Sequence, residues 1–346
     1  MLITGCPTSP NMSSPKHSGD RKRKLNASKF YQEYKGHTVP DLEVFHHETR
    51  KLRPNKPILW FAGDSSLDNK FWLTGSGPGG DPLPVPVPTI YEHILEPPQP
   101  KPDVAFWVNH VMGDRATCIN TSIEESMLRE RDGGNLLPQD EFLKDNIRQG
   151  DALVVSIGGN DIALKPTPRT VWHLLRLAWF TRRSSIEDGT ASSLRYFRWL
   201  FQTKTEEYIS RLVSINKPSA VVVCMIYYPL ESRYKQKSWA AASLASLGYN
   251  WWPGQLQAAI KKMFEMGTRE VRVEGTEVLP CALFDVMDGT RKEEYVERVE
   301  PSSEGGRKMA GRFGELLDGI LGIGGDEKNG NMEQEGEGRY SLRKRN

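Results

Sequence analysis

Residues 57–67 read Pro57-Ile-Leu-Trp-Phe-Ala-Gly-Asp-Ser-Ser-Leu67, and this stretch decides the fold that we predict for the chain. Its apolar run at 58–62 is typical of a strand that is covered on both faces of a parallel sheet. Gly63 follows where the backbone must bend, and it brings Asp64 and Ser65 to the carboxyl end of the strand. Ligands of open parallel α/β sheets bind at that end. The same Gly-Asp-Ser triplet is also an ordinary helix-capping turn, so both interpretations stay open at this point.

The composition of the whole chain excludes several classes of protein. It has 346 residues, 38% of them hydrophobic, and a formal net charge of +2. A chain of this length can bury a full core as one large domain, and its charge gives no general bias toward nucleic acid. The four cysteines have no CxxC or other metal-ligand spacing, which predicts small buried thiols in a reducing compartment. The glycines at 75–80 lack the Lys-Ser/Thr ending of a phosphate-binding loop. We therefore expect no metal, no cofactor and no nucleic-acid partner.

The two ends of the chain differ in composition from its middle. Residues 1–50 are rich in Ser, Pro, Lys and Arg, and the tail at 323–346 is rich in Gly and Glu, so both are expected to be disordered. Residues 56–322 are expected to form the folded domain. The sequence contains no signal-peptide pattern and no membrane span, which favours a cytoplasmic protein. The basic run Arg-Lys-Arg-Lys at 21–24 is also compatible with nuclear import.

Apolar, strand-like runs alternate with helical patterns through this domain. Strands are predicted at 58–62, 116–120, 152–157, 220–227 and 277–286, and helices at 90–95, 104–112, 139–148, 255–266 and 304–321. This alternation predicts a three-layer α/β/α sandwich with a mostly parallel five-stranded sheet. Residues 165–216 are too long for a plain crossover and are rich in aromatic residues, which predicts a helical insertion or lid. An aromatic helix that simply packs on the sheet would have the same pattern.

Three polar turns follow predicted strands in a fixed order: Gly63-Asp64-Ser65, Asn120-Thr-Ser-Ile-Glu-Glu125 and Gly158-Gly-Asn160-Asp161. With this order and spacing, residues 56–322 resemble the SGNH (GDSL-type) hydrolase superfamily. The resemblance implies an esterase or acyl hydrolase in which Ser65 attacks the ester carbonyl. It also implies that Asn160 and the amides of Ser65 and Glu125 stabilise the oxyanion. The implied substrate is a small-molecule, lipid or glycan ester, and the implied chemistry needs no cofactor.

Two positions depart from the pattern of that family. The second motif normally supplies a glycine amide where this chain has Glu125, whose side chain would oppose an oxyanion if it pointed inward. The last motif, Asp-x-x-His, is matched here by Glu297-Arg-Val-Glu300, so a glutamate replaces the histidine base. A carboxylate with a pKa near 4.3 is about two units less basic than an imidazole, which lowers its proton-accepting power by roughly 3 kcal/mol. Burial near Asp64 and Glu297 would raise the pKa of Glu300 and recover part of that basicity.

Two functions therefore stay open. Glu300 is either the atypical base of an active esterase, or a residue that caps the last helix or pairs with Arg298 or Arg307. In the second case, the chain is a catalytically degenerate SGNH scaffold that binds a small or cationic ligand without hydrolysis. Carboxylates gathered by the motifs must then be neutralised by protonation, an arginine or a bound cation. His173 is the last histidine of the chain and a further candidate base, although a lone histidine on an amphipathic helix is usually a boundary residue.

Overall fold

The computed structural model describes residues 24–77 and 80–321, and its centre is a sheet of five parallel strands. The strands are β2 (Ile58–Gly63), β4 (Thr117–Asn120), β5 (Ala152–Ser156), β6 (Ala220–Met225) and β7 (Glu277–Ala282). Their spatial order is β4-β2-β5-β6-β7. The predicted α/β fold with a five-stranded sheet is confirmed, and the sheet is parallel throughout rather than mostly parallel.

The remaining elements surround this sheet. Two short strand pairs lie outside it, namely parallel β1 (Leu25–Asn26) with β3 (Leu95–Glu96) and antiparallel β8 (Tyr295–Val296) with β9 (Glu300–Pro301). The α-helices are α1 (Ala27–Gln32), α2 (Val39–Leu52), α3 (Thr89–Ile94), α4 (Val104–Met112), α5 (Pro138–Asn146), α6 (Gly159–Ala163), α7 (Pro168–Trp179), α8 (Arg183–Glu187), α9 (Leu194–Arg198), α10 (Thr205–Leu212), α11 (Ala241–Ser246), α12 (Pro253–Met266) and α13 (Ser303–Leu317). A π-helical segment, η3 (Trp199–Lys204), joins α9 to α10. Within the described residues, no helix has the length and apolarity needed to cross a membrane.

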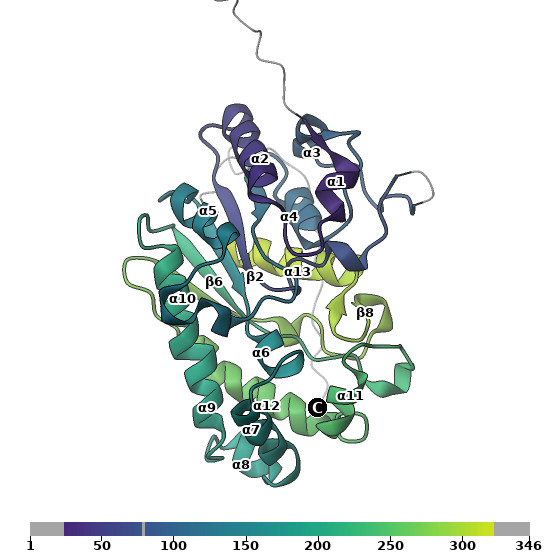
Figure 1. Ribbon diagram of the computed structural model, residues 1–346, viewed down its shortest axis with the longest axis vertical. Helices are drawn as coiled ribbons and strands as arrows, with labels where there is room; N and C mark the ends of the chain where they lie inside the picture. The colour runs from purple at the N-terminus through teal and green to yellow at the C-terminus, as the bar shows by residue number, and fades with distance from the viewer. Residues whose placement is uncertain (1–23, 78–79, 322–346) are drawn as a thin grey trace, which may run out of the picture.

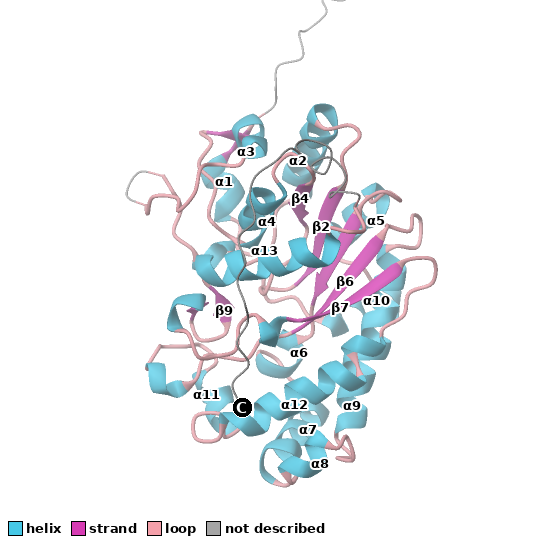
Figure 2. Cartoon of the chain, turned by 180° about the vertical axis from the view of Figure 1, so that it is seen from behind, coloured by secondary structure: helices cyan, strands magenta, loops and turns pink. Residues whose placement is uncertain are grey.

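Helices cover both faces of the sheet (Figure 1 and, from behind, Figure 2). Successive side chains of a strand point to opposite faces, and β2 illustrates this. Trp60 packs against Phe142 of α5 with ring centroids 6.0 Å apart, whereas Phe61 packs against Phe313 of α13 with centroids 5.8 Å apart. Both β2 residues are fully buried. The wholly apolar strand predicted from the sequence is therefore covered on both sides, and the molecule has three layers.

The buried core includes three of the four cysteines. Cys118, Cys224 and Cys281 are buried and form no disulfide, as predicted for small buried thiols, while Cys6 lies outside the described residues. Burial raises the pKa of the Cys118 and Cys224 thiols well above the usual value. Both thiols are therefore protonated and unreactive.

Part of the amino-terminal segment belongs to the fold, which corrects the disordered arm predicted for 1–50. Helices α1 and α2 form within it, and α2 contacts β4 and α5. The guanidinium of Arg50 donates to Asp151 at 2.6 Å, which fastens the end of α2 to the start of β5. Such contacts join residues that are far apart in sequence, so local composition did not indicate them. The remainder of the predicted arm, and the tail predicted at 323–346, lie outside the described residues.

Within the segment predicted as an insertion, 165–216, helices α7, α8 and α9 lie at one end of the molecule, where α11 and α12 also lie (Figure 1). The run α9-η3-α10 is continuous, and α10 packs against α5: Tyr208 Oη donates to Asp140 Oδ1 at 2.6 Å. Helices α7 and α8 pack against α12 instead. The second half of the segment therefore provides the crossover helix between β5 and β6, and the first half is additional to it.

The strand order produces a crevice at the carboxyl ends of β2 and β5. From β2 the chain moves to β4, toward one edge of the sheet, whereas from β5 it moves to β6, toward the opposite edge. In doubly wound sheets of this order, ligands bind where the two directions diverge. The turns that leave β2 and β5 at this point carry Ser65 and Asn160 respectively.

Candidate active site

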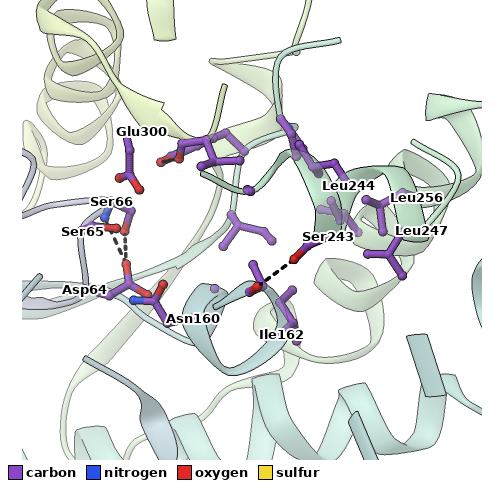
Figure 3. A pocket seen from close by; sticks show the side chains of 18 of the residues that line it. Asp64, Ser65, Ser66, Asn160, Ile162, Ser243, Leu244, Leu247, Leu256 and Glu300 are labelled. Carbon is purple, nitrogen blue, oxygen red and sulfur yellow. Dashed lines mark hydrogen bonds between the residues drawn. The ribbon is translucent and has the colours of Figure 1, made fainter. Parts of the chain in front are cut away.

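The turn after β2 is shaped by a glycine and stabilised by an aspartate. Gly63 has φ = +142°, and a Cβ atom there would lie 1.8 Å from the carbonyl oxygen of Ser156, so only glycine can pass this close to β5. The buried Asp64 carboxylate accepts hydrogen bonds from the amide and the hydroxyl of Ser66, at 3.1 and 2.7 Å. Ser65 lies between these two residues and lines a cavity (Figure 3). Asp64 thus performs the turn-capping role that the triplet allows, while Ser65 faces the space in which a ligand can bind.

Asn160 reaches the same cavity from the first turn of α6, directly after β5. Its Nδ2 atom donates to the carbonyl of Ser126 at 3.1 Å. An amide nitrogen carries two N–H groups, so this bond orients the side chain and leaves a second donor. The neighbouring Asp161 accepts from the amides of Leu128 and Arg129 at 2.7 and 3.2 Å, and so anchors α6 to the adjacent loop. These contacts fix the position of Asn160 at the cavity.

Glu300 enters the cavity from β9, just before α13. It is 2% exposed, and its carboxylate points toward Ser65 (Figure 3). Trp239 Nε1 donates to Glu300 Oε1 at 3.1 Å, whereas Oε2 is buried and has no well-formed hydrogen bond among the described residues. The Ser65 hydroxyl is near enough to lower the pKa of Glu300.

Several buried carboxyl groups gather around Glu300, and their pKa values are raised. Burial raises the pKa of Glu300 to about 8, with the charges of Asp64 and Glu297 acting in the same direction and two hydrogen bonds opposing it. Burial raises the pKa of Asp64 to about 6. Burial, followed by the charge of Glu300, raises the pKa of Glu124 well above its usual value. Glu300 and Glu124 are thus mostly protonated at neutral pH, so protonation relieves the carboxylate repulsion expected from the sequence.

The side chain of Glu125 points away from the cavity. It forms ion pairs with Lys35 and Lys165, at 3.5 and 3.9 Å, and accepts a hydrogen bond from Tyr34 at 3.1 Å. Its φ of +60° lies in the left-handed region, which is easiest for glycine. In the described part of the chain, the backbone amides of Glu125 and Ser65 donate to no acceptor. The negative charge is therefore directed elsewhere, and two unpaired amide donors remain in the turns that follow β4 and β2.

Glu297 contacts the active-site region only indirectly. It lies in the turn between β8 and β9, and its Oε2 atom accepts a hydrogen bond from the backbone N–H of Trp239 at 2.9 Å. Among the described contacts, none is a hydrogen bond between Glu297 and Glu300. Trp239 links them instead, because its indole binds Glu300 while its backbone binds Glu297. Sequence reasoning missed Trp239, which belongs to no motif and is brought to the site by a long loop.

The arginines that could pair with Glu300, and the histidine that could replace it as a base, interact with other groups. Arg298 donates to a backbone carbonyl at 2.8 Å, and Arg307 pairs with Glu304 on its own helix at 2.6 Å. His173 lies 3.2 Å from a serine hydroxyl of the helical segment and stacks on a tyrosine. No histidine of the described residues lines the cavity. Among the described residues that line the cavity, the carboxyl groups are those of Asp64 and Glu300, and Asp64 already accepts two hydrogen bonds from Ser66.

Away from these groups, the cavity continues as an apolar hollow. The cavity as a whole, its polar end included, has a volume of about 100 Å³. The aliphatic residues that line it include Ile162, Ala163, Leu174, Ile226, Leu244, Leu247, Leu256, Ile260 and Val299. Small-molecule sites are typically apolar hollows with a few polar groups at one position, and this cavity has that form. The described residues include no group of three or more His, Cys, Asp or Glu side chains suited to hold a metal ion.

No protein-family model and no curated protein matches the sequence. Solved structures with distant similarity to this chain include the following two. One, provisionally described as a platelet activating factor from Streptococcus pneumoniae, is 13% identical with a TM-score of 0.35, over 82% of this chain and 94% of its own. The other, a carbohydrate esterase family 3 structure from Talaromyces cellulolyticus, is 11% identical with a TM-score of 0.35, over 77% of this chain and 99% of its own. Neither similarity is close enough to assign a reaction, so the function must be inferred from the site.

Proposed function

We propose that the protein is an SGNH-type serine hydrolase of carboxylic esters, with Ser65 as nucleophile and Glu300 as base. The observation that carries the proposal is the convergence of Ser65, Asn160 and Glu300. These residues come from three distant segments and meet at one end of an apolar cavity, at the divergence point of a parallel sheet. Acyl transfer through a serine requires a hydroxyl nucleophile, a base and an oxyanion donor, and these three side chains offer a hydroxyl, a carboxyl and an amide.

In the proposed reaction, the Glu300 carboxylate takes the proton of the Ser65 hydroxyl while Ser65 Oγ bonds to the ester carbonyl carbon. The carbonyl oxygen becomes an oxyanion, for which Asn160 Nδ2 and the amides of Ser65 and Glu125 are the donors. The tetrahedral intermediate then expels the alcohol, which receives the proton held by Glu300. Water, deprotonated by Glu300, attacks the acyl-serine, and the proton returns to Ser65 as the acid is released.

The raised pKa of Glu300 makes a glutamate base workable. With a pKa of about 8, its carboxylate is a stronger proton acceptor than an ordinary glutamate. The corresponding disadvantage is that little of Glu300 is ionised at neutral pH, because only about one-tenth of a carboxyl is ionised when the pH is one unit below its pKa. The proposed enzyme is therefore most active in alkaline solution, where Glu300 is ionised before the reaction begins.

A second candidate function is ligand binding without hydrolysis, on a catalytically degenerate scaffold. The observation that favours it is the position of Glu297, which binds the backbone of Trp239 instead of orienting Glu300. In the described part of the chain, Glu300 is oriented by the Trp239 indole alone, and a base that lacks a carboxylate partner loses part of its catalytic effect. A cationic ligand is less favoured than a neutral one, because the raised pKa values of Glu300 and Glu124 leave both carboxyl groups mostly neutral.

Labelling with a fluorophosphonate probe tests for the nucleophile. The probe is expected to modify Ser65 in the wild-type chain, increasingly so between pH 7 and 9, with the modified residue identified by peptide mass spectrometry. Labelling is expected to vanish in Ser65→Ala. It is expected to persist in Ser66→Ala, because the hydroxyl of Ser66 is hydrogen-bonded to Asp64 and Ser156 in the wild type and is not the proposed nucleophile. A wild-type chain that stays unlabelled throughout this pH range would contradict an active nucleophile.

Ester hydrolysis by Glu300 variants separates the two candidate functions. An active glutamate base predicts measurable wild-type turnover that is lost in both Ser65→Ala and Glu300→Gln. A degenerate scaffold predicts negligible wild-type turnover and a Ser65-dependent gain in Glu300→His, since an imidazole restores the usual base. The matched control is Glu187→Gln, an exposed carboxylate on α8, which should leave the rates unchanged.

A further inference from the structure

The chemistry of the cavity changes with distance from Ser65. Its catalytic end contains Asn160 and Glu300, whereas the walls beyond come from α6, α7, α11 and α12 and are aliphatic. Figure 3 shows Leu247 and Leu256 on the side of the cavity opposite Ser65. Two of these helices are additions to the sheet and its crossovers. Helix α7 belongs to the first part of the insertion, and α11 lies in the long segment between β6 and α12.

The polar atoms of the walls already have partners within the protein. The Ser243 hydroxyl donates to the carbonyl of Ala163 at 3.4 Å, and Tyr227 Oη donates to the carbonyl of Val299 at 2.7 Å. A sugar in this hollow would give up its hydrogen bonds to water without replacing them, which is costly for each hydroxyl. An alkyl chain has no such requirement and gains from burial.

We propose that this hollow binds the acyl chain of the substrate, so that the preferred esters carry unbranched aliphatic acids longer than acetate. The proposal rests on the proposed esterase function and names its substrate class. The alcohol must leave beside Glu300, because Glu300 returns the proton to it. The hollow is lined by Ile162 and Ala163 beside Asn160 and also by Trp239 and Val299 beside Glu300. Its assignment to the acyl side of the ester rests on the walls that continue along α6 past Asn160.

A series of esters tests the direction and the length of the hollow. Each methylene buried should raise kcat/KM by roughly fourfold until the hollow is filled. We expect p-nitrophenyl butyrate and octanoate to be hydrolysed progressively faster than the acetate, whereas a matching series of alkyl acetates shows no such rise. An increase along the alkyl acetates instead would place the alcohol in the hollow and overturn the assignment, as would equal rates for all acyl lengths.

Variants at the far wall test the location. Leu247→Trp fills the hollow and Leu256→Gln makes it polar, and both positions are only half-buried, so the fold should tolerate them. Each is expected to lower the octanoate-to-acetate ratio of kcat/KM at least tenfold. The control Ile215→Trp, at a 59% exposed residue before β6 at the opposite edge of the sheet, should leave that ratio unchanged. Ratios that stay at the wild-type value in both wall variants would refute the proposal.

Ligand binding separates a failure of this proposal from a failure of the esterase function. In Ser65→Ala, which cannot turn over, unbranched methyl ketones mimic the ester without being cleaved. We expect 2-decanone to raise Tm, 2-butanone to have little effect, and Leu247→Trp to abolish the shift. This result would show that the hollow binds an alkyl chain even if the wild type were inactive, and the two ester series decide which side of the ester that chain belongs to. No shift by 2-decanone, or a shift that Leu247→Trp retains, would refute the acyl site whatever the activity.

Discussion

Replacement of Glu300 by glutamine should make the stability of the protein less dependent on pH. The pKa of Glu300 is about 8 in the folded protein, whereas an ordinary glutamate has a pKa of 4.5. Between these values the folded state holds a proton that the unfolded state releases, so the free energy of unfolding falls as pH rises. The contribution is fully present below pH 4.5 and is lost by about pH 8. At 1.36 kcal/mol per unit, the loss is at most about 5 kcal/mol.

Glutamine has the shape of the protonated carboxyl and can still accept the hydrogen bond from Trp239. Urea denaturation of the wild type and of Glu300→Gln at pH 5, 7 and 9 gives the free energy of unfolding of each. We expect the two proteins to be similar at pH 5 and the variant to be more stable by several kcal/mol at pH 9. The surface variant Glu187→Gln, in an exposed pair with Arg183, serves as the control. A difference between wild type and Glu300→Gln that is the same at pH 5 and pH 9 would refute a raised pKa for Glu300.

Three further outcomes are expected. The kcat/KM for ester hydrolysis should rise with pH and level off above about pH 8, because the base acts as a carboxylate; a rate that is already constant between pH 5 and 7 would contradict Glu300 as the base. Asn160→Ala should lower kcat about 10²- to 10³-fold with a smaller change in KM, measured by steady-state kinetics, and an unchanged kcat would exclude Asn160 as an oxyanion donor. Lys70→Met should lower the free energy of unfolding by about 3–5 kcal/mol, since it leaves the fully buried Asp68 without its cation. If urea denaturation shows a decrease below about 1 kcal/mol, Lys70 and Asp68 do not form the buried ion pair described.

Local sequence patterns determined the layout of this protein. Each of the five strands is a short apolar run followed by turn residues, and such runs are recognisable without their partners. Because parallel strands place their carboxyl ends at one edge, the order of the motifs also predicted that Ser65 and Asn160 would approach each other. Because Glu300 aligns with the last motif, it was predicted to join Ser65 and Asn160. All three residues line one cavity.

Only the tertiary structure decided what depends on contacts between distant segments. The direction of the Glu125 side chain is set by Tyr34 and Lys35, in a part of the chain whose composition suggested disorder. The link between Glu297 and Glu300 passes through Trp239, which no motif marks. The raised pKa of Glu300 and the aliphatic hollow likewise arise from burial by elements that come from distant parts of the sequence. Strand patterns are local properties of the chain, whereas burial, charge environment and cavity shape are properties of the packed whole.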